Sequence, residues 1–381
     1  SSDVCSSDLH VDAYAQGDGS VTIRKGATPA EDETVDVDGI QINANADEHL
    51  YSFAAGGQVS KKFAGGVTLS VSTIDSTTNA YIGDADINQE TAHTKDSDQS
   101  VRVAATHDTF IVGVGGGFSV GGKAGIGASN DTQVVTKSTK AWIGDNAAVH
   151  AENDIIVEAL TSEFHVSVAA TAAIAYEAQG VAVQGSVSVH TVTNTVQAMI
   201  GDTAVITAGG DILVTADDEY DLIVVAAGVA GGGNVGVGGS VGVVVHTNTV
   251  EASIGSSTQV SSDGSVSVSA SNDASVIGVA GSISIGGKAA GIGLSNIDVV
   301  HTESVQAFIE SDAVINAKGN GAGVSIYTGS KENGNRTTQD IHGLAVTATS
   351  FESLIGVAAG GAGGGKVGVA GSATIGVLTD T

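Results

Sequence analysis

The sequence is built from a repeat of about 55 residues, and this periodicity limits the possible folds more than any other feature. A motif Ala-x-Ile-Gly-Asp places its isoleucine at Ile82, Ile143 and Ile200, and altered copies follow at Ile254 and Ile309. Successive isoleucines are 61, 57, 54 and 55 residues apart. Self-similarity at a fixed period is typical of solenoids, in which each unit buries apolar side chains on the next unit.

A Gly-rich segment that ends in Ser precedes each motif. The Ser lies 14 residues before the Ile in four copies and 12 residues before it in the first, and these positions are Ser129, Ser186, Ser240 and Ser295, with Ser70 in the first copy. A sixth segment ends at Ser372, and the Ile that should follow it would fall beyond Thr381. We therefore expect the chain to be an internal segment of a longer protein, truncated within its last repeat.

Short runs of apolar or alternating residues within each repeat are separated by Gly, Asn and Asp. This pattern is typical of strands joined by tight corners, and no window shows a helical period with caps. A repeat of this length divides into about three coils of about 18 to 20 residues. The sequence therefore predicts an all-β fold, a right-handed parallel β-helix or β-solenoid with about three coils in each repeat. About 19 such coils, stacked at roughly 4.8 Å each, would form a rod on the order of 90 Å long.

The composition excludes several other classes of protein. The chain has 54 Gly among 381 residues but one Pro, which excludes collagen, and its 41% of hydrophobic residues excludes intrinsic disorder. Lys and Arg number 14 against 42 Asp and Glu, so the formal net charge is −28. This charge repels phosphate backbones and anionic lipid headgroups, and we expect no nucleic-acid partner.

The first residues need separate treatment. Residues Ser1–Leu9, SSDVCSSDL, match the translation of a sequencing-library adapter, and we interpret them as an artefact. This interpretation removes Cys5, the only cysteine, so disulfides and thiolate chemistry are not expected. Residues 10–45 are predicted to form an irregular or partial repeat, and residues 46–381 to form the solenoid.

The recurring segments NTVQAMIGDTAVITAGGDILVTA and VAAGVAGGGNVGVGGSVGVVV resemble the repeats of very large bacterial β-helix exoproteins, namely filamentous-haemagglutinin-like adhesins and leukotoxin-type proteins. The resemblance extends over most of the chain from about residue 40. It implies export to the outer membrane surface or the medium, an extracellular location, and surface glycans or proteins of host or neighbouring cells as partners. The expected role is a non-catalytic adhesin stalk or shaft.

Two alternatives from other classes remain open. One is a secreted leukotoxin-like cytotoxin with membrane-active Gly/Ala/Val segments, and the other is a polysaccharide-active β-helix enzyme. The segment Leu222–Val245 has 24 residues and no charge, which is long enough for a membrane helix. Equivalent stretches carry Lys123, Lys288 and Lys366, so we expect a pair of buried strands with a corner.

Catalytic motifs are weak. A GxSxG match at residues 238–242 has no following helix, and two GxGxxG matches, at residues 231–236 and 363–368, fall at one repeat position and are predicted to be corners. Residues 141–287 contain no Lys or Arg, which disfavours a groove for acidic polysaccharide. We therefore expect no catalytic residues and no cofactor, apart from the weak Ca²⁺ binding described below.

Histidines recur at the end of the Gly-rich segments. His190, His246 and His301 follow their repeat serines by four to six residues. A row of histidines on one face could bind a metal. Their Thr and Asn neighbours instead favour solvated strand positions.

Acidic residues gather before each apolar run, and we interpret this place as one corner of the solenoid with protruding loops. The group includes Asp47, Glu48, Asp96, Asp98, Glu163, Asp217, Asp218, Glu219, Asp221, Asp273 and Asp340. The candidate metal ligands are Asp217, Asp218, Glu219 and Asp221, because Ca²⁺ prefers several oxygen ligands on a flexible loop. The repeat lacks the GGxGxDxUx pattern of calcium-dependent β-rolls, so we expect weak, roughly millimolar Ca²⁺ binding.

Overall fold

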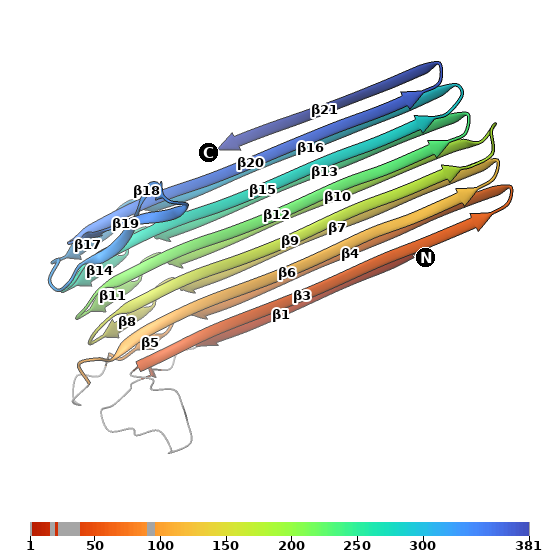
Figure 1. The fold of residues 1–381 in the computed structure, drawn as a ribbon. Helices are drawn as coiled ribbons and strands as arrows, with labels where there is room; N and C mark the ends of the chain where they lie inside the picture. The colour runs from red at the N-terminus through yellow and green to blue at the C-terminus, as the bar shows by residue number, and fades with distance from the viewer. Residues whose placement is uncertain (1, 16–19, 22–38, 90–95, 381) are drawn as a thin grey trace.

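The computed structural model describes residues 2–15, 20–21, 39–89 and 96–380, and these residues form strands but no helix. The strands stack in parallel in three sheets (Figure 1). Sheet 1 contains β1 (Ser2–Ala15), β4 (Phe63–Ile82), β7 (Ala124–Ile143), β10 (Val181–Ile200), β13 (Val235–Ile254), β16 (Ala290–Ile309) and β21 (Val367–Asp380). Sheet 2 contains β3 (Gly39–Ser60), β6 (Ser100–Gly121), β9 (Ile155–Ala175), β12 (Ile212–Gly232), β15 (Val266–Gly286) and β20 (Leu344–Gly364).

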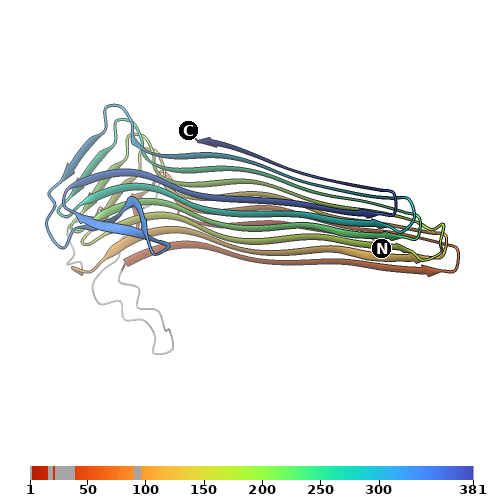
Figure 2. The same cartoon turned by 45° about the horizontal axis from the view of Figure 1, so that its top comes forward.

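A third, short sheet lies at one end of the long strands, and tight turns join sheets 1 and 2 at the other end (Figure 2). The short sheet contains β2 (Ser20–Val21), β5 (Asp86–Ile87), β8 (Ala148–Ala151), β11 (Val205–Ala208), β14 (Gln259–Ser262) and β17 (Val314–Ala317). An antiparallel hairpin of β18 (Val324–Glu332) and β19 (Asn335–Ile341) is inserted before β20. Each coil passes through a long strand of sheet 2, a long strand of sheet 1 and a short strand.

The parallel all-β solenoid is as predicted, but the number of coils is not. Val181 of β10 pairs with Val235 of β13 and with Ala124 of β7, so hydrogen-bonded neighbours are 54 and 57 residues apart. One repeat therefore forms one wide coil, and the prediction of about three coils in each repeat is wrong. A 20-residue strand spans about 66 Å. The seven strands of sheet 1 stack to about 30 Å, in place of the expected 90 Å rod.

Glycine explains this difference. The sequence pattern suggested that Gly-rich stretches break the strands, yet most of these glycines lie inside them. A methyl group at Gly115 would collide with the carbonyl oxygen of Asn130, and one at Gly236 with that of Ile285. Glycine is needed at these positions because another backbone approaches closely, not because the chain turns.

The repeated isoleucines form one column in the core, as predicted. Ile82 pairs with Ile143, Ile143 with Ile200, Ile200 with Ile254, and Ile254 with Ile309. The first four are fully buried and Ile309 is partly buried against the same apolar cluster. This first apolar cluster fills the short-sheet end of the solenoid and includes Ile87, Val149, Ile206 and Val260 of the short strands.

The Gly and Asp of the motif join successive coils at the adjoining turn. The backbone N–H of Gly201 donates to the carbonyl oxygen of Ile143 over 2.7 Å. Asp145 Oδ1 accepts the N–H of Asp202 over 2.8 Å, and Asp202 Oδ1 accepts that of Ser256 over 2.7 Å. The motif therefore encodes a core side chain, a close backbone approach and a hydrogen bond between coils.

The repeat serines form a second column and link the two long sheets. Ser186, Ser240 and Ser295 align and donate to the carbonyl oxygens of Ala227, Gly281 and Ala359 over 2.5, 2.8 and 2.8 Å. Ser129 lies in the same column, but Ser70 pairs with Asp131, and Thr68 takes the expected place. The assignment of Ser70 to this column is therefore wrong by two residues.

The segment Leu222–Val245 forms the second part of β12, a turn and the first part of β13, as predicted. Both GxGxxG matches lie at such turns, which confirms that they are corners. Among the described residues, no helix has the length and apolar character that a membrane span requires.

Replacing Ile200 with Asp tests the isoleucine column. The charge would be buried without a partner in the first apolar cluster, and we expect the free energy of unfolding to fall by about 3–5 kcal/mol. Thr193 faces outward on the same strand, so Thr193→Asp is the matched control and should change stability by about 0.5 kcal/mol or less. Urea unfolding measures both free energies of unfolding. If the two variants lost the same amount, the assignment of Ile200 to the core would be contradicted.

Candidate functional site

A band of polar side chains crosses the interior of the solenoid beside the first apolar cluster. It lies where the strands alternate strictly, so every second residue faces inward. Sheet 2 contributes Glu48, His107, Thr109, Glu163, His165, Asp218, Tyr220, Asn272 and Glu352, and sheet 1 contributes Lys137, His190, Asn194, His246, Asn248, His301 and Glu303. We call this set the buried polar band. Burying so many ionisable groups is costly unless each finds a partner.

In the early coils, each carboxylate of the band lies beside a basic side chain, and Glu163 lies beside both Lys137 and His165. His107 Nε2 lies 3.3 Å from Glu48 Oε2, and both side chains are buried. In the next coils, Lys137 Nζ lies 3.2 Å from Glu163 Oε1, with both side chains fully inaccessible to solvent, and donates to Thr109 Oγ1 over 2.6 Å. Each buried carboxylate here has a cation or an imidazole beside it.

Asp218 is held differently, by neutral donors. Asn194 and Asn248 donate to its two oxygens over 2.9 and 2.8 Å, and the hydroxyl of Thr161 also donates to it. Burial, together with the nearby Glu163, raises the pKa of Asp218 well above its ordinary value. Neutral donors therefore hold the Asp218 carboxyl group, and its surroundings favour the protonated form.

A row of rings continues the band along the axis. His165 Nδ1 and His190 Nε2 are 3.0 Å apart, and Tyr220 meets His165 edge to face with ring centres 5.4 Å apart. Tyr220 stacks on His246 at 4.1 Å, and His246 Nδ1 lies 2.9 Å from His301 Nδ1. Burial lowers the pKa of His190 to about 3 and the pKa values of His165 and His246 well below their ordinary range. These imidazoles are therefore neutral at pH 7.

The prediction of solvated histidines is thus wrong. His190, His246 and His301 face inward and are fully buried. Residues that follow one another along a strand alternate between its two faces. The outward positions of Thr193 and Thr247 therefore do not indicate that His190 and His246 are exposed. His246 aligns with His301, whereas His190 aligns with Val244 and lies two residues away from their column.

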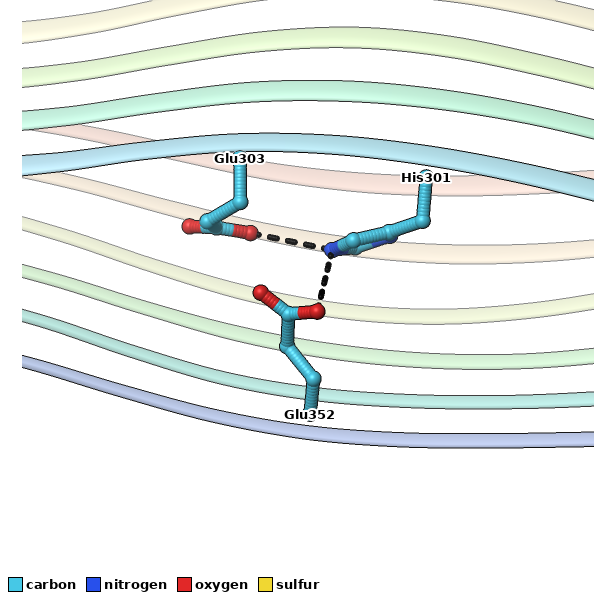
Figure 3. A group of neighbouring side chains, drawn as sticks. All are labelled: His301, Glu303 and Glu352. Atoms are coloured by element: carbon cyan, nitrogen blue, oxygen red, sulfur yellow. Dashed lines mark hydrogen bonds and ion pairs between the residues drawn. The ribbon is translucent and has the colours of Figure 1, made fainter. Parts of the chain in front are cut away.

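One group in the band has the ligand types of a metal centre. His301 and Glu303 point inward from β16, and Glu352 points toward them from β20 of the facing sheet (Figure 3). His301 Nε2 lies 3.1 Å from Glu303 Oε2 and 3.7 Å from Glu352 Oε2. Burial raises the pKa of Glu303 to about 8 and that of Glu352 to about 7, and it lowers the pKa of His301. The nearby carboxylate of Asp380 adds to the shifts of both glutamates.

The predicted Ca²⁺ ligands are not brought together. Asp217, Asp218, Glu219 and Asp221 lie within strand β12, not on a protruding loop, and the strand alternation turns Asp218 inward and the other three outward. Arg336 of the β19 hairpin donates to both carboxylate oxygens of Asp217, over 2.6 and 3.0 Å. The four carboxylates therefore do not share one cation, and the weak Ca²⁺ binding stays a prediction.

The other acidic residues also lie mostly inside strands. Asp47 and Asp273 occupy the column of Glu219, which faces outward, whereas Glu48 and Glu163 face inward. The predicted acidic corner is therefore the middle of sheet 2. Of the remaining acidic positions, Asp96 and Asp98 precede β6 and Asp340 lies on β19.

The GxSxG match has no exposed nucleophile. Ser240 lies inside β13 and is buried, and its hydroxyl donates to the Gly281 carbonyl. A hydrolase elbow needs a strained turn that exposes the serine.

The sequence did contain a signal for the band. Counting back from each motif isoleucine in steps of two identifies the inward positions, and six residues back lie Lys137, Asn194, Asn248 and Glu303. Eight residues back lie His246 and His301. Glu352 has no comparable marker, because its strand follows the inserted hairpin.

Comparison of this chain with protein-family models, with curated proteins and with solved structures gives no match.

The buried histidines predict a specific loss of stability in acid. The pKa of His190 is about 3 in the folded chain and about 6.5 in the unfolded chain, so unfolding takes up a proton at pH values between the two. The contribution of His190 to stability is therefore lost as the pH falls from 6.5 toward 3. We expect the free energy of unfolding of the wild type to fall by about 1.5–2 kcal/mol more than that of His190→Gln between pH 6.5 and pH 5.

Urea unfolding of both proteins at the two pH values measures this difference. The other histidines are common to both proteins, and burial, the main cause of the lowered pKa values of His165 and His246, acts in both, so their effects largely cancel. Equal losses in the two proteins would show that His190 is not held neutral in the folded chain.

Proposed function

We propose that this chain is a non-catalytic β-solenoid segment of a large bacterial cell-surface or secreted exoprotein and acts as an adhesin stalk or shaft. The observation that carries the proposal is the register, in which β4, β7, β10, β13 and β16 pair without a slip from one coil to the next. The sequence resemblance adds the bacterial source, the export and the extracellular location. It also adds the right-handed coil and partner molecules on the surfaces of other cells.

The hydrogen bonds suit a shaft because they run along the solenoid axis. Between neighbouring coils, two long strands and one short strand are hydrogen-bonded to their counterparts in the next coil. Further backbone hydrogen bonds at the turns connect Gly144 to Ile82 and Gly201 to Ile143. A pulling force along the axis is shared by all these bonds at once. The Asp145 and Asp202 turn bonds add to them.

A shaft should tolerate a change in coil number. Inserting three further copies of residues 181–234, which form the span from β10 to the turn before β13, should lengthen the particle by about 14 Å along its axis. The cross-section should stay the same, because each added coil buries its faces on its neighbours. Small-angle scattering and electron microscopy measure both quantities.

A matched insertion shows whether the register is responsible. Three copies of residues 181–233 omit one residue from each added coil, which turns inward side chains outward. This variant should unfold or aggregate. A shaft role would be contradicted if the in-register insertion also failed to fold, or if it folded without added length.

The outer faces near the turns favour the cytotoxin as a second candidate function. Outward residues of sheet 2 in this half are apolar and uncharged: Val112, Val114, Phe118, Val166, Val168, Ile174, Ile223, Val225, Val229, Ile277, Val279, Ile283, Ile285, Ile355 and Val357. Sheet 1 exposes Ile126, Leu294, Val367 and Val369 on the opposite face. A shallow apolar groove lies on sheet 2 around Val229 and Ile283.

The turns themselves are basic although the chain is acidic. Lys61, Lys62, Lys123, Lys288 and Lys366 lie at these turns, and Glu177 is the one acidic residue among the described turn residues. Between the turns and the middle of the sheet, each long strand has about ten residues, and these span about 33 Å. This is close to the hydrocarbon thickness of a bilayer, and the lysines would meet anionic headgroups.

Dye release from vesicles tests the second candidate. The wild type should release dye from anionic vesicles, and Val229→Glu with Ile283→Glu should reduce the release at least about tenfold, because two charges would enter the lipid. Thr193→Glu with Thr247→Glu adds the same charge to outward positions of sheet 1 that lie nearer the short sheet, and it is the control. Absence of release by the wild type would contradict the cytotoxin.

A further inference from the structure

We propose that His301, Glu303 and Glu352 bind a divalent transition-metal ion, with Zn²⁺ as the expected ion, inside the solenoid between β16 and β20. The site would connect sheet 1 with sheet 2 and is independent of the proposed shaft function.

The geometry of the three ligand atoms fits one ion. Zn²⁺ binds imidazole nitrogen and carboxylate oxygen at about 2.0–2.2 Å, so two ligands of a tetrahedral site are about 3.3–3.5 Å apart. The distances from His301 Nε2 to the two carboxylate oxygens are 3.1 and 3.7 Å, and all three ligand atoms lie within 4.8 Å of one another. Small side-chain rotations would complete the coordination.

The charge balance of the buried polar band also favours a cation here. Glu163 faces Lys137, Glu48 faces His107, and Asp218 receives several neutral donors. Glu303 and Glu352 instead share one imidazole, and each also accepts a hydrogen bond from a neutral donor, Asn248 and Ser350 respectively. Burial favours the protonated forms of these two carboxyl groups, and a cation held between them would let both ionise in this interior.

Hydrogen bonding orients the imidazole as metal sites require. His301 Nδ1 contacts His246 Nδ1 over 2.9 Å, and when it donates its hydrogen to His246 the Nε2 lone pair points toward both carboxylates. Metal-bound histidines commonly donate their other ring N–H to a neighbouring acceptor. Glu352 Oε2 is buried and makes no hydrogen bond, and its side chain is 6% exposed.

The ligand set favours a transition metal over Ca²⁺ or Mg²⁺. Those two ions prefer six or more oxygen ligands or retained waters, whereas one imidazole with two carboxylates suits Zn²⁺. Asp380 pairs with Glu303 in register on β21 and is exposed, so its carboxylate can supply the fourth ligand from the solvent side. A water molecule is the other candidate for that position.

Metal binding to the full chain tests the proposal. The chain, freed of metal with a chelator and of any affinity tag, should bind about one Zn²⁺ by titration calorimetry, with a higher melting temperature in its presence. Co²⁺ should give the visible absorption of a four- or five-coordinate site with a nitrogen ligand. Ca²⁺ at the same concentration as Zn²⁺ should give neither a binding signal in calorimetry nor a higher melting temperature.

Glu352→Gln is the informative variant. It keeps the shape of the side chain and removes one buried negative charge, so it should fold at least as stably as the wild type without metal while its Zn²⁺ affinity falls about 100-fold or more. His301→Gln should lose binding as well. His190→Gln, which changes a buried histidine without neighbouring carboxylates in contact, is the control and should bind as the wild type does.

Three results would overturn the proposal. The first is a folded wild type that binds no Zn²⁺ at millimolar concentration. The second is binding that persists unchanged in Glu352→Gln and His301→Gln, which would place the ion elsewhere, for example at the exposed His10 and Asp12. The third is a preference for Ca²⁺ over Zn²⁺.

Discussion

The parallel, in-register pairing of coils is the constraint on which the rest of the structure depends. Because side chains alternate between faces with a period of two, a slip of one residue would exchange every inward side chain for an outward one. The register also decides which residues of different coils are neighbours. The column of Ile82, Ile143, Ile200 and Ile254 is a core because four residues far apart in the sequence occupy the same place in four coils.

Buried polar groups make this register more specific. An apolar column loses little when coils slip by two residues, since another Val or Ala takes the place of the first. Lys137 and Glu163 come from facing sheets, and a slip would separate a pair that is fully inaccessible to solvent. Breaking a buried ion pair costs about 3–5 kcal/mol, although forming it adds little stability. The polar band is therefore better understood as a device that selects one alignment than as a source of stability.

The sequence predicted the parts of the fold that depend on repetition. The period, the parallel strands and the isoleucine column all follow from residues that recur, and the structure agrees with them. The width of the coil could not be predicted in the same way, because glycine has two uses that look alike in a sequence. Gly115 and Gly236 allow a close backbone approach inside a strand, whereas Gly233 lies at a turn. Only the position of the facing strand distinguishes these cases.

The candidate site was harder to predict for a related reason. Asp217, Asp218, Glu219 and Asp221 are adjacent in the sequence, but adjacency along a strand places side chains on opposite faces. His301, Glu303 and Glu352 are brought together by two strands that are separated by a short strand and a hairpin. A period of two from the motif would have found His301 and Glu303, but the partner on the facing sheet depends on how the two sheets align.

Along each long strand, from the short sheet toward the turns, the inward side chains become smaller and the outward side chains become more apolar. Near the short sheet, large Ile and Val side chains fill the inside, while outward positions carry Thr, Gln and charged residues. Near the turns, the inward positions are Gly, Ala and Ser, and the outward ones are Val and Ile. A second apolar cluster, which includes Ile111, Leu222, Val224 and Ile297, lies between the buried polar band and the turns. Beyond this cluster, the small inward residues bring the two sheets closer, and large apolar side chains also lie on the outside, where they are available to lipid or protein. One coil can therefore combine a buried core with an apolar outer surface near the turns, and each additional repeat extends both.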